Sequence, residues 1–383
     1  MFFGINKIKE KEGYSNSMRR KYWFYLSVIS LLTTGCSERN QQPSLEELSL
    51  VTAIAFDYID ESSMQITVAM PQPAEEASKP TQTTSVKASL MKEGIIQISN
   101  KSDRMVSLSQ LRVAFFSEEF ARKGKMEEVI EYLYRDTEVR ENVHLGIVSG
   151  EAGEIITSEY PDKPTTSVYL TRLLEPRLYT SFSSFTDLHI FIYDTKNPIL
   201  DTQVAYLEMK EGIPEISKLA LFKDHLMVDT VSKDDGKIIQ VLTGLTKAAP
   251  MDFQLKENEE ILLEFIKSQV NIKGNNNLES PKVTISLTLQ GSLDEYNGEI
   301  SLTSNDGVKE LERSVEKKLE TDIQDLINKF KKLQIDPVGF SEKFRMRYEG
   351  KWTRELTMQI LEKAEFDVNV DVKIINIGTL EES

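Results

Sequence analysis

Apolar residues recur in steps of three and four between positions 308 and 333, which predicts a long helix with one apolar stripe. The stripe consists of Val308, Leu311, Val315, Leu319, Ile323, Leu326, Phe330 and Leu333. The residues expected to face water are Lys309, Glu312, Lys317, Lys318, Asp325 and Lys329. Such a stripe is typical of a helix that packs on a sheet, and a coiled-coil partner surface is the alternative. Pro337 ends this pattern, and a further helix is predicted over 339–348.

Alternating apolar and polar residues predict strands on both sides of this helix. Val283–Leu289 alternates before it, and Phe366–Ile374 alternates after it, with valines on one face and Asp, Asn and Lys on the other. A strand with one wet face favours antiparallel pairing. Glu299–Thr303 is predicted to form another strand.

Strands and helices alternate in the first half of the chain. The predicted strands are Leu50–Asp57, Met64–Met70, Leu111–Phe116 and Val143–Val148, and the predicted helices cover 92–100, 118–134 and 151–158. Residues 71–85 contain three prolines and many small polar residues, which predicts a surface loop. The middle of the chain predicts a helix over 165–179, a strand at Leu188–Tyr193, a hairpin of Ser217–Phe222 with His225–Thr230, and a helix over 237–247. This alternation predicts an α/β (α+β) fold with helices packed on sheets.

The N-terminus contains a secretory signal. Three cations, Arg19, Arg20 and Lys21, precede the ten-residue apolar run Trp23–Leu32, which is too short to cross a bilayer as a permanent helix. Small residues then lead to Cys36, the only cysteine of the chain. The signal and its processing site therefore occupy residues 1–36, and translation is expected to start at Met18, where the better signal begins.

The ending Leu32-Thr33-Thr34-Gly35-Cys36 resembles a lipoprotein processing site, although Thr33 stands where leucine is usual. At such a site a diacylglyceryl group is attached to the cysteine and the chain is cut before it. Two acyl chains are sufficient for stable anchoring, because each buried methylene contributes about 0.8 kcal/mol. Cys36 is therefore predicted to be lipidated, and a buried structural cysteine is the alternative.

Charge argues against some classes of partner. The chain has 46 Lys and Arg against 61 Asp and Glu, a net charge of −15. Residues 1–36 contain six of those bases and two of those acids, which leaves the remainder at −19. This excess of acidic groups argues against nucleic acid as a partner and against electrostatic adhesion to anionic lipid. No other stretch approaches the length of a membrane span.

No motif for catalysis, metal binding or cofactor binding stands out. The three histidines, His144, His189 and His225, are far apart in the sequence, and each is interpreted as structural. Gly150 and Gly153 flank a strand-to-helix turn, which is interpreted as a bend rather than a phosphate cradle. The sequence therefore predicts a protein that is not an enzyme and has no cofactor.

Three parts of the chain resemble the C-subunit lipoproteins of spore germinant receptors, the Ger(x)C family. They are the processing site at Cys36 with Leu50–Asp57, then Gln110–Gly124 with its continuation to Arg140, and finally the hairpin Leu219–Asp229 with Val308–Leu333, Asp336–Phe340 and Asp367–Lys373. Two positions depart from the family. Ser37 stands where tryptophan often follows the lipidated cysteine, and Gln110 stands where histidine often precedes the Leu-Arg pair.

The resemblance implies three domains, each a mixed or antiparallel sheet flanked by helices, which we expect at 44–160, 161–250 and 251–380. It also implies a non-enzymatic lipoprotein on the outer face of the spore inner membrane. Its partners would be the integral-membrane A and B subunits of the receptor, and its role would be nutrient-triggered spore germination. The alternative is an extracytoplasmic solute-binding lipoprotein of a transporter, which would need two lobes around a polar pocket.

Overall fold

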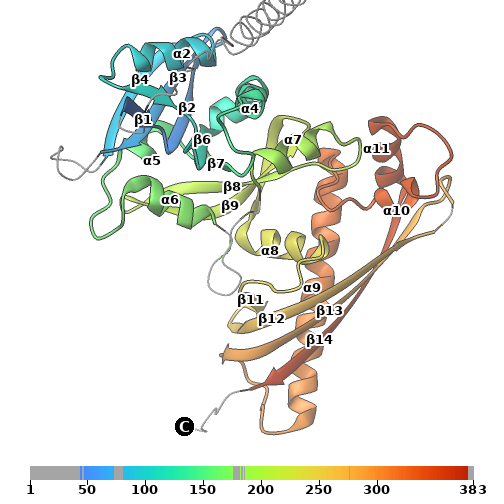
Figure 1. Cartoon of the computed structure of the whole chain (residues 1–383). Coiled ribbons are helices and arrows are strands. Elements are labelled where there is room, and N and C mark those ends of the chain that lie inside the picture. Colours follow the sequence, from blue (N-terminus) through green and yellow to red (C-terminus); the bar gives the residue numbers. More distant parts are fainter. Residues whose placement is uncertain are drawn as a thin grey trace, which may run out of the picture. The chain divides into compact units, whose positions relative to one another are not determined.

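An eight-stranded sheet organises the first two thirds of the protein (Figure 1). This computed structural model describes residues 44, 47–72, 81–175, 182, 184, 186–275 and 277–377. The strands follow the order β10-β9-β8-β7-β6-β2-β3-β4. Their bounds are β2 Ala53–Asp60, β3 Ser63–Pro71, β4 Thr81–Ala88, β6 Val113–Ser117, β7 His144–Val148, β8 Gln203–Lys210, β9 Ile213–Lys223 and β10 Leu226–Ser232.

The four central strands, β8, β7, β6 and β2, are parallel, and antiparallel strands extend the sheet on both sides. Helices cover both faces, so every residue of β6 is buried. One face packs on α2 (Met91–Ser99), α3 (Glu118–Arg122), α4 (Met126–Arg135) and α7 (Leu188–Lys196). The other packs on α5 (Ala152–Thr157), α6 (Thr166–Leu174) and α8 (Lys233–Leu242). Phe115 and Phe116, adjacent on β6, point into these two separate cores.

A second sheet of four strands follows, in the order β11-β12-β13-β14. It consists of β11 (Met251–Lys256), β12 (Glu259–Gly274), β13 (Lys282–Tyr296) and β14 (Glu365–Asn376). Helix α9 (Asn305–Leu333) packs against it through Leu311, Val315, Leu319 and Ile323, which confirms the predicted stripe. The short helices α10 (Glu342–Arg345) and α11 (Arg354–Lys363) complete this part, and a small parallel sheet joins β1 (Leu48–Leu50) to β5 (Met105–Ser107).

The architecture confirms the predicted α/β class, with sheets flanked by helices. Strands from both sides of residue 160 pair within the eight-stranded sheet, through β7 and β8. One apolar core also continues from the α8 face of this sheet into the second sheet. The limits of the three domains, 44–160, 161–250 and 251–380, stay predictions.

Several predicted elements were wrong. Residues 188–193 form the first part of helix α7 rather than a strand, because Asp187 caps the helix by accepting a hydrogen bond from Ile190 N at 2.8 Å. Residues 299–303 belong to no strand, whereas β11 and β12 had not been predicted. The predicted helix over 118–134 is divided into α3 and α4 at Gly124, whose φ is +71°. Residues 81–85 of the predicted loop belong to β4, and residues 73–80 lie outside the described ranges.

Strand β14 is parallel to β13, which corrects the expected antiparallel pairing. The two strands are joined through α9, α10 and α11, and a connection of this length returns the chain to the same edge of the sheet in the same direction. The alternation in β14 correctly indicated one wet face, but alternation alone contains no information on strand direction.

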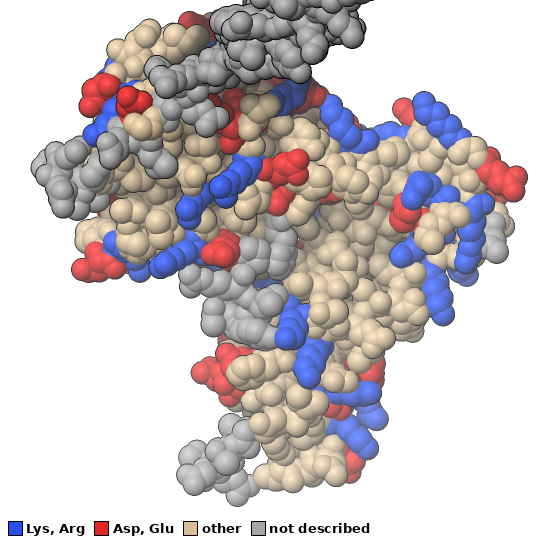
Figure 2. All heavy atoms as spheres, viewed as in Figure 1, with Lys and Arg blue, Asp and Glu red and all other residues tan. Residues whose placement is uncertain are grey.

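Charged groups of both signs are interspersed on the face drawn in Figure 2, where Lys and Arg gather mainly around α10 and α11. Within the described ranges, no helix is long and apolar enough to cross a membrane.

We predict that Leu319→Ala lowers the free energy of unfolding by about 2–5 kcal/mol, because Leu319 is fully buried between α9 and the second sheet. Urea denaturation would measure the loss. Lys317→Ala, two positions away on the exposed face of α9, should change stability by less than about 0.5 kcal/mol. Equal effects of the two variants would contradict the packing of the stripe.

Candidate functional site: a buried polar junction

The residues that the sequence singled out do not assemble into one site. Cys36, the predicted lipidation site, lies outside the described residues. His189 belongs to α7, with its Nδ1 3.7 Å from Glu141, and His225 lies between β9 and β10, 3.3 Å from Glu127. Burial lowers the pKa of His144, at the start of β7. Among the described residues, no group of three His, Cys, Asp or Glu side chains is placed to hold a metal ion.

The carboxyl ends of the parallel strands are where ligands bind in open α/β sheets. Here the Asp57 carboxylate from β2 accepts hydrogen bonds from Ala152 N at 2.5 Å and Gly153 N at 2.9 Å, at the start of α5. A Cβ on Gly153 would lie 3.1 Å from Asp57 Oδ2, so the glycine allows this close approach. Burial raises the pKa of Asp57, and the two N–H donors act in the opposite direction. The chain's own carboxylate thus occupies the place where a phosphate could bind.

A cleft of about 620 Å³ opens beside this point and is lined by Tyr58, Glu118, Arg122 and others. Two charged groups of its wall, Glu118 and Arg122, have partners within the protein. Glu118 accepts hydrogen bonds from Tyr206 Oη at 2.5 Å and from Arg122 Nε at 2.6 Å. Glu119, Lys123 and Glu151 also line the cleft.

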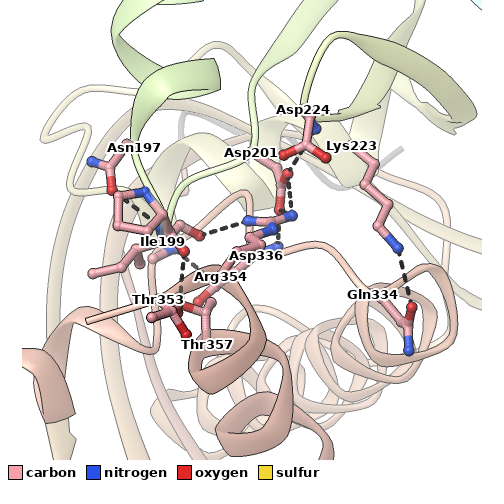
Figure 3. Close-up of polar contacts among 12 residues, drawn as sticks. Asn197, Ile199, Asp201, Lys223, Asp224, Gln334, Asp336, Thr353, Arg354 and Thr357 are labelled. Carbon is pink, nitrogen blue, oxygen red and sulfur yellow. Dashed lines mark hydrogen bonds and ion pairs between the residues drawn. The ribbon is translucent and has the colours of Figure 1, made fainter. Parts of the chain in front are cut away.

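The most strongly constrained polar cluster joins the end of α7 to the C-terminal third of the chain (Figure 3). Arg354 Nη2, at the start of α11, lies 2.5 and 2.6 Å from the two carboxylate oxygens of Asp201. Arg354 Nη1 donates to Ile199 O at 3.4 Å. The Asp201 side chain is only 1% exposed and that of Arg354 is 20% exposed, so this ion pair is shielded from water. Such pairs are costly to break, because the remaining charge is left buried.

Backbone groups complete the environment of Asp201. Its carboxylate accepts from Asp336 N at 2.7 Å and from Asp224 N at 3.4 Å, and Asp201 N donates to Asp336 O at 3.3 Å. Burial raises the pKa of Asp201 to about 6, although the Arg354 guanidinium and these N–H donors favour the ionised form. The charge of Asp201 therefore depends on its partners.

The side chain of Asp336 stabilises the turn formed by the segment Asp336–Phe340. The Asp336 carboxylate accepts from Gly339 N at 2.8 Å, Phe340 N at 2.9 Å and Ser341 N at 2.9 Å. Gly339 has a φ of +77°, and a Cβ there would lie 2.8 Å from Leu200 Cδ2. The positive φ favours glycine, and Leu200 would have to shift to admit a Cβ, so the Asp-Pro-Val-Gly-Phe motif is a tight turn next to Asp201.

Helix α11 also contacts the segment that follows α7. Thr357 Oγ1 donates to Pro198 O at 2.7 Å and accepts from Trp352 Nε1 at 2.7 Å. Lys223 Nζ, at the end of β9, donates to Gln334 Oε1 at 3.0 Å, as Figure 3 shows. We call this cluster, formed by Pro198, Asp201, Asp336, Arg354 and Thr357, the polar junction.

Helix α9 adds two further connections. Glu312, Glu316 and Glu320 accept hydrogen bonds from the N–H groups of Ile374, Val372 and Val370 at 2.8, 3.0 and 3.2 Å. Lys329 contacts β10, with Nζ 3.0 Å from Asp229 Oδ2 and 2.7 Å from Thr230 O. Glu312 and Lys329, which were expected to face water, are thus half-buried. Both side chains bind backbone or acidic groups of neighbouring strands.

Of the polar junction, sequence reasoning found only Asp336–Phe340, as part of a resemblance and without a role. Asp201 and Arg354 lie 153 positions apart, and neither belongs to a local pattern. No signal in a single sequence could have paired them.

This geometry defines a class of protein. It is an α/β protein with two large sheets, whose parts are joined by a buried ion pair. The family model for the spore germination protein N-terminal domain matches residues 41–209, and the model for the spore germination B3/GerAC-like C-terminal domain matches residues 217–378. The chain therefore belongs to the Ger(x)C family of spore germination proteins. The polar junction joins residues of both matched regions, because Asp201 lies in the first and Arg354 in the second.

Relatives match over nearly their full length. The Bacillus cereus spore germination protein GerQC is 25% identical over 363 residues, which cover 94% of this chain and all of the relative. Spore germination protein B3 of Bacillus subtilis is 23% identical, with 88% of this chain and 93% of the relative covered. The crystal structure of the GerBC protein matches with a TM-score of 0.54 at 18% identity, over 84% of this chain and 97% of that chain. The likeness to GerBC shows the fold.

We predict that Arg354→Ala lowers the free energy of unfolding by about 3–5 kcal/mol, because it leaves the Asp201 carboxylate buried and unpaired. Adding Asp201→Asn should cost much less in the Arg354→Ala background than in the wild type, since the buried charge is then already unpaired. Urea denaturation of the four proteins measures this coupling.

Arg345→Ala is the matched control, because it breaks a similar two-bond pair with Glu342 that is exposed. It should cost less than about 1 kcal/mol, and additive effects at 201 and 354 would contradict the coupling.

Substitution of two glycines can distinguish the cost of backbone strain from the cost of close packing. Gly339→Ala and Gly212→Ala both place a Cβ at a φ near +77°, but nothing would lie within 4 Å of the Cβ at position 212. Gly212→Ala should cost about 1–2 kcal/mol through backbone strain alone. Gly339→Ala should cost clearly more, because its Cβ meets Leu200. Thermal unfolding compares the two variants, and an equal loss of stability would show that the turn has room at Leu200.

Proposed function

We propose that this protein is a membrane-anchored, non-enzymatic lipoprotein subunit of a spore germinant receptor. A diacylglyceryl group on Cys36 would hold it on the outer face of the spore inner membrane. There it assembles with the membrane-embedded A and B subunits and takes part in nutrient-triggered germination. The observation that carries this proposal is the match of the two germination-protein models, which together extend from residue 41 to residue 378 with a short gap between them.

Two features of the chain support the anchor. The signal ends at the only thiol of the protein, and the described body begins twelve positions later, at Leu48 in β1. The chain after Cys36 is acidic, so its charge would not hold it at an anionic bilayer, whereas two acyl chains on Cys36 would.

The structure also bears on the alternative of a solute-binding lipoprotein. Such proteins close two lobes on a ligand, whereas here a buried ion pair and a continuous apolar core hold the two family regions together. The usual ligand position at the carboxyl ends of the parallel strands is filled by Asp57. Both features favour an assembly role through the outer surfaces.

We predict that Cys36→Ala moves the protein from the membrane fraction to the soluble fraction and impairs nutrient-triggered germination, because the attachment point for the lipid is lost. Immunoblots of fractionated spores and the fall in optical density on nutrient addition measure the two effects. Ser37→Ala, the neighbouring change, should leave both unchanged.

Normal fractionation and germination of Cys36→Ala would contradict the anchor. Co-purification of integral-membrane subunits with the wild-type chain tests assembly separately. A saturable rise in unfolding temperature with one amino acid or sugar would favour the transporter alternative.

A further inference from the structure

Three large apolar side chains are exposed on or beside α2. Leu90, just before the helix, is 66% exposed, Ile96 within it is 51% exposed, and Met105 on β5 is 58% exposed. The opposite side of α2 is buried against the eight-stranded sheet through Met91, Ile95 and Ile98. Ile96 is therefore an apolar side chain on the outer side of α2, and Leu90 and Met105 are exposed on the neighbouring segments. We call Leu90, Ile96 and Met105 the α2 face.

The elements that carry the α2 face lie against each other and against the first strand. Helix α2 contacts β5, and Met105 of β5 pairs with Leu48 of β1. Ser49 Oγ of β1 lies 3.1 Å from Ser102 Oγ, in the connection between α2 and β5. The α2 face is thus attached to the point where the described body begins.

An apolar groove extends the α2 face toward α4. Leu90 lines a groove of about 510 Å³ together with Met64, Met91, Val129 and Tyr132, and its rim is charged, with Lys92, Glu128, Glu131, Arg135 and Asp136. The exposed apolar surface at Leu90 therefore continues into a concave region rather than ending at one side chain.

The length of chain before β1 restricts where this surface can lie. Cys36 precedes Leu48 by twelve positions, and a fully extended chain of that length spans about 40 Å. A lipid on Cys36 would therefore keep β1, and with it β5 and α2, within about 40 Å of the bilayer.

Charge is compatible with this placement. Residues 87–105 contain four Lys or Arg and two Asp or Glu, whereas the chain after Cys36 has a net charge of −19. Lys92 on α2 is exposed. Residues 87–105 thus have an excess of two cations, which attracts anionic headgroups, while the acidic groups near α2 lie on α4 and just after it, at Glu128, Glu131 and Asp136.

We propose that the α2 face rests on the lipid bilayer, with Leu90, Ile96 and Met105 inserted at the level of the headgroups and Lys92 beside the phosphates. The inference deepens the proposed function, on which it rests through the lipid at Cys36. It adds an orientation, in which the α2 side of the eight-stranded sheet faces the membrane and the second sheet is left free for contact with partner subunits.

The experiment uses the full chain and its single thiol. In the lipidated wild type no thiol is free, so Leu90→Cys, Ile96→Cys and Met105→Cys each introduce one site for a polarity-sensitive fluorophore. Controls of matched exposure are Ile375→Cys for Met105 (60% against 58%) and Ile213→Cys for Ile96 (49% against 51%). The labelled proteins are reconstituted into vesicles of equal parts phosphatidylethanolamine and phosphatidylglycerol, with or without brominated acyl chains.

We expect brominated lipid to quench the three probes of the α2 face at least about twofold more than the two control probes, as for side chains at the headgroup level. Unchanged thermal unfolding of each variant shows that the fold is retained. Iodide quenching of the same probes in native spore membranes gives the second readout, and the α2 face should be protected there.

Each outcome separates the two proposals. Quenching at the α2 face no greater than at the controls, in protein that floats with the vesicles, overturns the orientation and leaves the anchor intact. Labelling of the wild-type protein shows a free Cys36 and overturns the anchor. Protection from iodide in native membranes without quenching by brominated lipid assigns the α2 face to a protein partner and overturns the contact with lipid.

Discussion

The ion pair between Asp201 and Arg354 is the contact that joins the two sequence regions of this protein. Asp201 is almost fully buried, and its carboxylate is stabilised by one guanidinium and by backbone donors from two separate turns. None of these donors comes from a residue next to Asp201 in the chain. A buried carboxylate with such distant partners is stable only when all of them are in place, so the junction forms together with the whole fold or not at all. A movement of one family region relative to the other would have to break this pair.

Helix α9 also joins the two large sheets, through contacts along its whole length. Its apolar stripe packs on the second sheet, its three glutamates bind the outer edge of β14, and Lys329 binds β10 of the first sheet. The glutamates are one turn apart, about 6.0 Å along the axis, and alternate N–H groups of a strand are about 6.6 Å apart. This match lets one helix satisfy an edge that would otherwise be open to pairing with another chain. The edge of β14 is therefore closed by side chains rather than by a further strand.

The positions where α/β proteins usually bind small molecules are occupied here by the protein itself. Asp57 fills the start of α5, and Glu118 is bound by Arg122 and Tyr206. The outer surface in addition exposes apolar side chains near the first strand. Exposed apolar side chains of this kind mark the places where contact with another molecule would bury the most apolar surface.

The sequence by itself determined the class of fold, most of the helices and strands, the apolar stripe of α9 and the family, because these depend on local periodicity and on contiguous motifs. It failed at residues 188–193, where one capping aspartate decides for helix over an apolar run that is equally compatible with a strand. It also failed at β14, whose alternation shows a wet face but contains no information on direction. Only the tertiary structure brought together Asp201 and Arg354, or placed Glu312 against a strand. Such contacts depend on the path of the chain over more than fifty residues, and no local pattern records that path.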